Sequence, residues 1–410
     1  MQMSLKSKIS IFVMFAVMVL LMPRAFIKTS ETKAMAIVTA LGVDAVGTDI
    51  EVSAQIVIPK AQAGTTRSIV AVSAKNTDMA SALQDISTYM GKKIGIEHCD
   101  VIVVGKKISE NGVEDCLDYF FRGNRIEHNI LIVFFDGEAK ELIDSTSKID
   151  NNFSLTIDEI TKFSGEYFST VETTLEKFYS EHYSPNKVSV IGGLKINDGE
   201  YGLSLSDTGE SAKQESQGGG QSQGQEEKKN KFLLNEGEVA VFKDWKLAKI
   251  FSRKQTEQMN WLLKSAKRYS LRVDDVNDGL FEGASVIFDV KEKDVSFKSR
   301  FVGDTPVWDI NITVDLKLEN IIGGDKNKYK NFHKEFLTPM LRAKTIKTII
   351  NDVDEIVKVM KEEKLDVFRI YDLFEKTNYG KLKEYTQKYG RENFYQSLIY
   401  NVNVNLYERV

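Results

Sequence analysis

The residues that most often carry out catalysis are scattered through this sequence. Two Ser-x-x-Lys pairs, Ser30 with Lys33 and Ser145 with Lys148, match a nucleophile–base spacing, but neither S-D-N nor K-T-G accompanies them. The sequence contains no G-x-S-x-G, H-E-x-x-H or P-loop motif. Its only run of three glycines, residues 218–220, lies in a strongly polar segment. The pattern therefore predicts neither a nucleophilic nor a phosphate-binding centre.

Titratable side chains also fail to form a recognisable centre. The acidic pairs at residues 274–275 and 362–363 lie among other charges, which favours a solvated surface over an acid–base pair. The two cysteines are outside any C-x-x-C motif and are predicted to pack as small hydrophobic side chains, in preference to a disulfide. The histidines are far apart in sequence and are predicted to be capping or surface residues: His98, His128, His182 and His333. We therefore predict no metal, no cofactor and no enzymatic activity.

Composition limits the class of partner. Lysine and arginine number 55 against 59 acidic residues, and no basic stripe is visible, so nucleic acid is not an expected partner. Hydrophobic residues make up 42% of the chain and aromatic residues 10%, which is enough for well-packed cores. The length beyond residue 30 predicts two or three domains.

Residues 1–29 are predicted to form a signal or anchor segment. Residues 9–22 are apolar except for Ser10 and follow Lys6 and Lys8, as in a secretory signal. As a helix this run is about 21 Å long, shorter than the roughly 30 Å hydrocarbon core, and extension to Ile27 nearly spans it. No A-x-A-like cleavage site or lipid-bearing cysteine follows. A cleaved signal and an anchor with its N-terminus in the cytoplasm both place residues 30–410 outside the cytoplasm. The charges on the two sides of the run are balanced, so the reverse orientation stays open. The alternative to a signal or anchor is a buried core helix.

Residues 30–150 are predicted to form an α/β domain. Strand-like runs at residues 36–43 and 50–58 flank a short loop and indicate a hairpin, followed by a third strand at 68–74. Asp78 then precedes a helix with apolar residues at 3–4 spacing. Later strands at 101–104 and 130–135 are apolar on both faces, which is typical of strands covered by helices on each side.

Residues 151–282 are predicted to form a middle α/β domain with an insert. Strands are expected at 188–196 and 238–242, and a helix near 254–264. Between them, residues 206–231 lack large apolar side chains, so they are predicted to be a disordered insert.

Residues 283–410 are predicted to form a C-terminal α+β domain. Long alternating strands at 286–290, 295–301 and 307–318 are followed by a helix with one apolar stripe from Ile346 to Met360. The final run, 398–407, alternates apolar residues with asparagines. We therefore expect an antiparallel sheet packed by long helices, and overall a multidomain α+β and α/β fold of mixed sheets covered by helices.

Several short segments, taken in order, resemble one known family. They are residues 31–44, 81–91, 98–105 (HCDVIVVG), Gly112, the Phe121-Arg122 pair, 137–139, 240–247 through 262, and Asp366-Val-Phe. Their order and spacing are similar to those of the C-subunit family of spore germinant receptors, Ger(x)C. The sequence departs from the family at the missing lipid-bearing cysteine and at Phe394-Tyr395, where the family usually has a tryptophan.

The resemblance implies a non-catalytic receptor subunit on the outer face of the spore's inner membrane. It implies two polytopic membrane subunits as partners and a role in nutrient-triggered germination, while direct contact with the nutrient stays open. Asp44, Arg122 and Asp366 match family positions and are our candidate partner-contact or family-motif residues. The structural alternative is that Asp44 only ends a hairpin strand and Arg122 only caps a helix. The functional alternative is a membrane-anchored extracytoplasmic hydrolase or cell-wall-modifying enzyme with an unrecognised site.

Overall fold

The computed structural model describes most of the chain beyond residue 34. The described residues are 35–58, 68–123, 126–144, 168–197, 233–276, 281–324 and 336–409, together with Met14, Ile157, Thr161 and Lys162. The predicted anchor, apart from Met14, and the predicted insert at 206–231 lie outside them and stay predictions. None of the helices in these ranges combines the length and the apolar character needed to cross a membrane.

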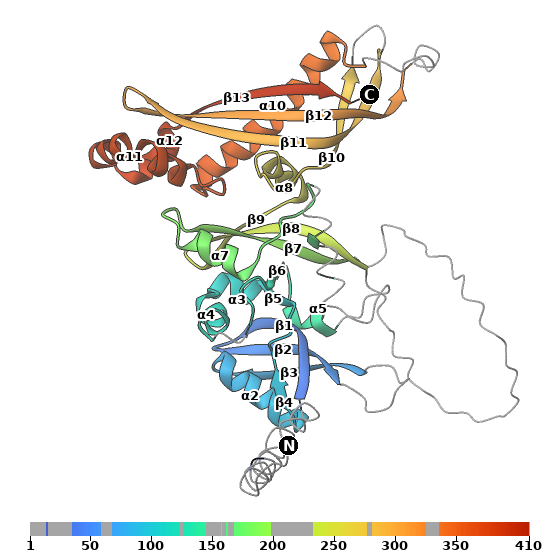
Figure 1. Ribbon diagram of the computed structural model, residues 1–410, viewed down its shortest axis with the longest axis vertical. Helices are drawn as coiled ribbons and strands as arrows, with labels where there is room; N and C mark the ends of the chain where they lie inside the picture. The colour runs from blue at the N-terminus through green and yellow to red at the C-terminus, as the bar shows by residue number, and fades with distance from the viewer. Residues whose placement is uncertain are drawn as a thin grey trace, which may run out of the picture.

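Two sheets follow one another along the long axis of the molecule (Figure 1). The strands are β1 (Met35–Val46), β2 (Asp49–Ile58), β3 (Ser68–Asn76), β4 (Lys93–Gly95), β5 (Val101–Gly105), β6 (Leu131–Phe135), β7 (Val188–Asn197), β8 (Leu233–Lys243), β9 (Lys246–Phe251), β10 (Tyr269–Val276), β11 (Ala284–Val302), β12 (Thr305–Gly323) and β13 (Ile399–Glu408). The helices are α2 (Met79–Met90), α3 (Lys106–Asn111), α4 (Glu114–Arg122), α5 (Ala139–Asp144), α7 (Leu175–His182), α8 (Arg253–Asn260), α10 (Pro339–Glu363), α11 (Ile370–Tyr389) and α12 (Phe394–Ser397), with a 3-10 turn, η2 (Arg391–Asn393).

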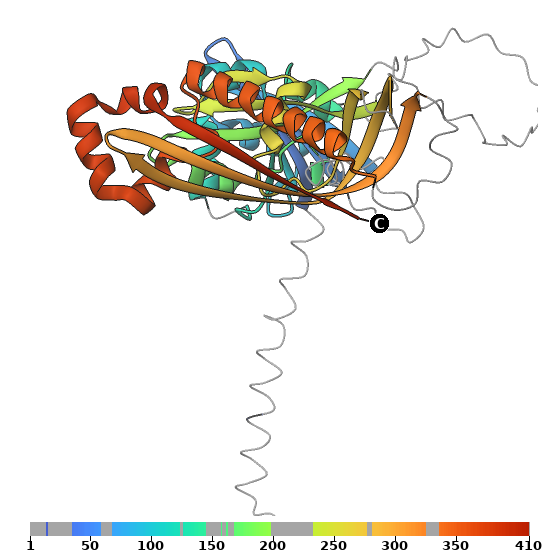
Figure 2. The same cartoon turned by 90° about the horizontal axis from the view of Figure 1, so that it is seen from above.

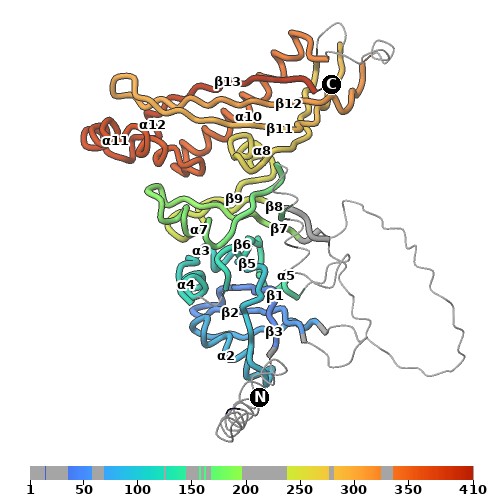
Figure 3. The backbone as a smooth tube through the Cα atoms, viewed as in Figure 1, coloured from blue at the N-terminus to red at the C-terminus, as the bar shows by residue number. Residues whose placement is uncertain are grey.

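The N-terminal sheet has nine described strands, in the order β3-β2-β1-β5-β6-β7-β8-β9, with β4 beside β1. Its centre, β1-β5-β6-β7, is parallel, and both flanks are antiparallel. The predicted hairpin is confirmed as β1 and β2, which turn at Gly47 with φ of +64°. The tube in Figure 3 shows how the chain then passes from this sheet, through β9 and α8, into the C-terminal sheet.

Helices cover both faces of the N-terminal sheet. Every residue of β5 and β6 is buried, as predicted for strands that are apolar on both faces. One face packs against α2, α3, α4 and α7, and the other packs against α5. The predicted start of α2 is also confirmed, because the Asp78 side chain accepts a hydrogen bond from the Ser81 N–H (2.9 Å).

The C-terminal sheet has the order β10-β11-β12-β13 and is covered on one face. Figure 2 shows α10 lying along that face. The predicted stripe of α10 is confirmed by buried Ile349, Val353 and Ile356, whereas Ile346 and Ile350 are only partly buried. The side chains of the opposite face of the sheet are mostly polar and accessible to solvent.

One detail of the C-terminal prediction is wrong. The strands β10, β11 and β12 are antiparallel as expected, but β13 runs parallel to β12. Between these two strands the chain forms α10, α11 and α12, and such a helical crossover returns it to the end of the sheet where β12 began.

The predicted domain limits at residues 150 and 282 stay predictions. The hydrogen bonds between strands divide the chain at other places. Strands on both sides of residue 150 belong to the nine-stranded sheet, since β6 pairs with β7. The C-terminal sheet begins with β10 at Tyr269, before residue 283.

Candidate functional site at the junction of the two sheets

Asp44 is a buried carboxylate that caps a helix far away in sequence. It lies within β1, which continues to Val46, so it does not end the strand. Its Oδ1 accepts the N–H of Ala139 (2.7 Å), and its Oδ2 accepts the N–H of Lys140 (2.9 Å). These are the first N–H groups of α5, which have no partner inside the helix. Burial raises the pKa of Asp44, although both N–H groups favour the charged form.

Three segments of the family resemblance meet at this cap. A Cβ added to Gly105 would lie 2.0 Å from Asp44 Oδ1 and 3.0 Å from the carbonyl oxygen of Gly137. The N–H of Lys106 donates to that carbonyl (2.9 Å). The absence of a side chain at residue 105 therefore makes room for the carboxylate, and the segments at 44, 105 and 137–139 form one structural unit.

Asp366 plays the same part in the C-terminal region. It is buried, its Oδ1 accepts the N–H of Ile370 (2.8 Å), and its Oδ2 accepts the N–H of Tyr371 (2.9 Å). The hydroxyl of Tyr395 donates to Oδ2 as well (3.1 Å). Asp366 thus caps the N-terminus of α11 across the turn formed by Arg369, whose φ is +57°. Burial raises the pKa of Asp366 against these three hydrogen bonds, which favour the ionised carboxylate.

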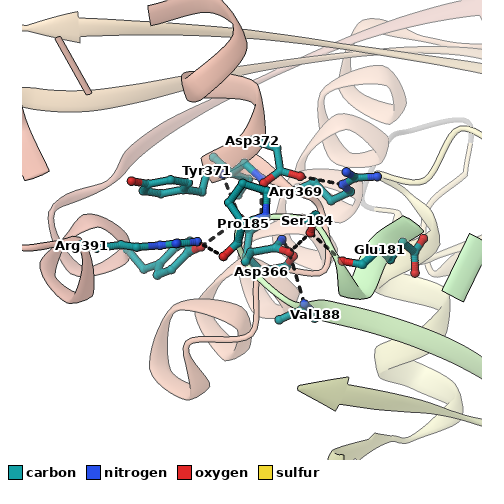
Figure 4. A network of polar contacts seen from close by, with 12 residues as sticks. Glu181, Ser184, Pro185, Val188, Asp366, Arg369, Tyr371, Asp372 and Arg391 are labelled. Carbon is teal, nitrogen blue, oxygen red and sulfur yellow. Dashed lines mark hydrogen bonds and ion pairs between the residues drawn. The ribbon is translucent and has the colours of Figure 1, made fainter. Parts of the chain in front are cut away.

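The turn at Asp366 also joins the two sheets (Figure 4). The side-chain N–H of Asn186, in the loop before β7, donates to the Asp366 carbonyl oxygen (2.8 Å). The Asn186 amide oxygen accepts the N–H of Val188 (3.2 Å), which fixes the amide. Arg391 donates to the carbonyl oxygen of Pro185 and lies over the Tyr371 ring, 4.1 Å from its centre. A loop of the N-terminal sheet is therefore held by the residues around the start of α11.

A second contact between the regions is made on α10 by α8 and by Trp261, the residue that follows it. The indole N–H of Trp261 donates to Asp352 Oδ2 (3.2 Å), and the amide of Gln258 donates to Glu355 Oε2 (2.5 Å). Lys254 pairs with the same Glu355 carboxylate (2.9 Å). Burial raises the pKa of Asp352.

The end of α8 is held from the other side by Lys293 of β11. This buried lysine donates to the carbonyl oxygens of Asn260 (2.5 Å), Trp261 (3.1 Å) and Leu263 (2.6 Å). All three ammonium hydrogens can therefore be bound by the carbonyls at the helix end, which otherwise lack helical partners. Burial lowers the pKa of Lys293 to about 7.

Arg122 lies apart from both capping carboxylates. It is in the last turn of α4, where a cation interacts favourably with the helix dipole, and its Nε lies 2.6 Å from Asp118 Oδ1. Its side chain is 77% exposed. The structure thus places two of the three predicted positions in buried caps and the third on the surface.

The remaining candidates for chemistry are not assembled into a centre. Across the described ranges, no three or more His, Cys, Asp or Glu side chains are placed to hold a metal ion. His128 stacks on Phe121, His182 is buried against Trp245, and Cys99 and Cys116 are free and buried. Near the start of β5 and β6 lies a polar depression of about 310 Å³ whose lining includes Glu97, His98, Asp100, Glu127, Asn129 and Lys162.

The fold and these caps define a layered α/β and α+β scaffold in which the motif carboxylates hold helices and the junction in place. Family models cover most of the chain: "Spore germination protein N-terminal domain" matches residues 28–196, and "Spore germination B3/ GerAC like, C-terminal" matches residues 237–408. The chain therefore belongs to the GerAC-like family of spore germination proteins, the C subunits of spore germinant receptors.

A solved structure has the same fold. The crystal structure of the GerBC protein is 15% identical in sequence, with a TM-score of 0.54, and the alignment covers 90% of this chain and 97% of that chain. A search of curated protein sequences found no match.

Sequence reasoning did not predict the roles of the residues that contact the two carboxylates or complete the junction. Asn186, Tyr395 and Gly105 complete the caps and the junction, but none belongs to a catalytic or ligand-binding pattern. The available signal for Tyr395 was its place in the Phe394-Tyr395 pair, one of the two points at which the sequence departs from the pattern it resembles. Phe394 is fully buried there, and Tyr395 supplies the hydroxyl that reaches Asp366.

Proposed function

We propose that this chain is the non-catalytic, extracytoplasmic subunit of a nutrient germinant receptor, assembled with two polytopic membrane subunits. Family membership supports a receptor subunit that acts in spore germination. The non-catalytic assignment rests on the structural role of the Asp44 and Asp366 carboxylates. Both motif carboxylates are buried and accept backbone N–H groups at helix N-termini, so both serve the scaffold.

The exposed position of the motif is Arg122, and we assign it to partner contact. Its ion pair with Asp118 is solvent-exposed, and such pairs contribute little to folding stability. A partner carboxylate can therefore replace Asp118 at little cost to this chain. Aromatic residues next to it, Phe121 and Tyr179, stack with ring centres 4.0 Å apart and give this surface a rigid base.

Membrane attachment is assigned to the apolar run at residues 9–22, without a lipid. This assignment rests on the sequence, in which the apolar run is present and no lipid-bearing cysteine follows it. A chain that begins at Ser30 should be soluble, whereas the full chain should fractionate with membranes and take up no radioactive palmitate. Cytoplasmic activity of a C-terminal reporter fusion would contradict the extracytoplasmic placement.

The test of function is deletion of the gene in the spore-forming host, with complementation by variants. Deletion should weaken germination toward particular nutrients and leave dipicolinate-triggered germination intact. Arg122→Ala should fold normally but co-purify poorly with the membrane subunits. The matched control is Lys358→Ala, which breaks another exposed i,i+4 ion pair, on α10. Normal nutrient germination after deletion, together with turnover of a cell-wall substrate by the purified protein, would instead establish the hydrolase.

A further inference from the structure

The last strand, β13, has one edge that pairs with no other described strand. It lies at the end of the sheet order and pairs only with β12 among the described strands (Figure 1). Its register is unbroken from Val307↔Ile399 to Leu316↔Glu408. Neither a bulge nor a proline interrupts it, and no charged side chain lies between Ile399 and Tyr407. Natural proteins usually block an edge of this length with such features, because an open edge pairs with other strands.

The hydrogen-bonding groups of this edge can be assigned from the contacts of β13. The N–H of Arg409 donates to Leu316 of β12 (2.8 Å), so the backbone groups of odd-numbered residues face β12 and those of even-numbered residues face outward. Two outward carbonyls are already bound, Leu406 by Arg342 (2.6 Å) and Leu398 by Lys361 (2.7 Å), both from α10. Between them, no contact within the described residues satisfies the outward groups of Val402 and Val404.

The sequence of β13 reads nearly the same in both directions about Asn403. Antiparallel pairing of two copies centred there places Val402 opposite Val404 of the second copy and Asn401 opposite Asn405. It places Ile399 opposite Tyr407, the two large hydrophobic side chains that the strand exposes, at 53% and 59%. Each polar residue thus meets a polar one and each apolar residue an apolar one, which is the condition for favourable cross-strand pairs.

We propose that β13 pairs antiparallel with β13 of a second copy of this chain, with the twofold axis at Asn403. Val402 and Val404 of the two copies then exchange N–H···O bonds, since their backbone groups face outward. Asn403 faces its own counterpart as a pair without backbone hydrogen bonds. The two four-stranded sheets become one continuous sheet, with α10 of each copy on the same side of its own half.

Two asparagine side chains of β13, on the solvent-facing side of the sheet, are already held by hydrogen bonds to β12 before any pairing. The Asn401 amide donates to Asp309 (2.7 Å), and the Asn403 amide donates to Asn311 (3.2 Å), both on β12. Their rotamers are therefore restricted before association, which lowers the entropy cost of forming the interface.

The register gives a sharp cross-linking test in membranes that contain the full chain. Residues opposite each other without backbone hydrogen bonds have Cα atoms about 4.5 Å apart, within disulfide range. Asn403→Cys should therefore give a disulfide-linked species of twice the mass after mild oxidation, reversed by dithiothreitol. The native Cys99 and Cys116 are buried and should not contribute.

Matched variants distinguish this register from random collision. Asn401→Cys and Asn405→Cys should each fail to cross-link alone, because each lies about 14 Å from its own counterpart. Co-expressed with distinguishable tags, they should cross-link to each other. Thr313→Cys, on the same face of β12, should not cross-link. Equal cross-linking of all the single variants, or none with Asn403→Cys, would overturn the proposal. A disulfide between Asn403→Cys and a different protein would also overturn it and would assign the edge to that protein.

A charge substitution tests the association without oxidation. Asn403→Lys places two ammonium groups directly opposite each other and should shift the detergent-solubilised protein from dimer to monomer in sedimentation velocity. Ser296→Lys, exposed on β11 two strands away, should leave the dimer unchanged. A wild-type protein that sediments as a monomer at all accessible concentrations would contradict the pairing.

Discussion

The carboxylate of Asp44 occupies the space in which a side chain at residue 105 would stand. A Cβ built on Gly105 falls 2.0 Å from Asp44 Oδ1, closer than any packed structure tolerates. The same oxygen accepts the N–H of Ala139, so the glycine in β5 and the start of α5 are linked through one buried group. These segments, which are far apart in the sequence, therefore share one contact.

Gly105→Ala should destabilise the protein by displacing this carboxylate. Loss of a helix cap costs about 0.5–2 kcal/mol. In a background of Asp44→Ala the same substitution should cost clearly less, because the cap is already absent. Equilibrium unfolding of the two single variants and the double variant gives the coupling between the residues. Strictly additive losses would show that Gly105 matters for another reason.

Gly380→Ala is the matched control for the glycine effect. Gly380 lies in α11, and an added Cβ there meets nothing within 4 Å. The substitution should raise the free energy of unfolding by about 0.5–1 kcal/mol, because alanine loses less backbone entropy in a helix than glycine does. A loss of stability here would indicate that the surroundings of α11 are more crowded than described.

Asp366→Ala should weaken both the start of α11 and the junction. It removes the acceptor for the N–H groups of Ile370 and Tyr371, and each unpaired buried donor costs about 1–3 kcal/mol. Tyr395→Phe removes only one hydrogen bond to the carboxylate and should cost less. Hydrogen exchange should show faster opening at 370–371 in Asp366→Ala than in Tyr395→Phe. Equal protection in the two variants would mean that the carboxylate does not hold the helix start.

Val353→Asp should unfold the C-terminal region selectively. Val353 is fully buried in α10, and loss of its burial costs about 1.5–3 kcal/mol before the cost of an unpaired charge is added. Limited proteolysis should then cut after about residue 269 and spare the nine-stranded sheet. Lys347→Asp, exposed on the same helix, should keep wild-type resistance. Resistance of Val353→Asp would mean that α10 does not form the core of this region.

His182 should make stability depend on pH. It is buried against Trp245, with ring centres 3.7 Å apart, and burial lowers its pKa below the usual value of 6.5. Below pH of about 6.5 the unfolded chain binds a proton that the folded chain does not, so the free energy of unfolding falls as pH decreases toward the lower folded pKa. Above about 6.5 both states are neutral at this residue, and its contribution no longer changes.

Comparison with His182→Phe isolates this contribution. Phenylalanine keeps the aromatic contact with Trp245 and cannot take up a proton. The stability difference between wild type and His182→Phe should therefore change between pH 7 and 5, with wild type losing more. His98→Gln, at an exposed position, should follow the wild-type curve. A constant difference across this range would show that His182 is not held neutral by the fold.

Much of the local structure was predictable because its signal is repeated along the sequence. The stripe from Ile349 to Met360 and the wholly apolar runs of β5 and β6 each contain several residues that report the same environment. The direction of β13 was not predictable from its alternation, since either direction buries the same face. It depends on the path of the helices that precede it.

The sequence identified which carboxylates belong to the candidate site, but it did not predict what they do in the fold. Asp44 and Asp366 were found through resemblance, but each carboxylate acts on backbone groups whose location the sequence does not reveal. Ala139 lies 95 residues from Asp44, and Asn186 lies 180 residues from Asp366. Contacts of this kind follow from how the strands are ordered in the sheets, and no local pattern encodes them.

The pairing of β7 with β8 has a consequence for how this chain can be divided. Asn197 and Leu233 are partners at the end of that ladder, and the boundary between the two family segments falls between them. The second segment therefore supplies most of β8 and all of β9, and these strands complete the sheet of the first segment. If the chain were cut between these two residues, one polypeptide would expose the unpaired edge of β7 and the other that of β8. The two polypeptides should therefore reassemble as a split protein. A gene rearrangement that moves one segment without the other would leave β7 without its antiparallel partner β8.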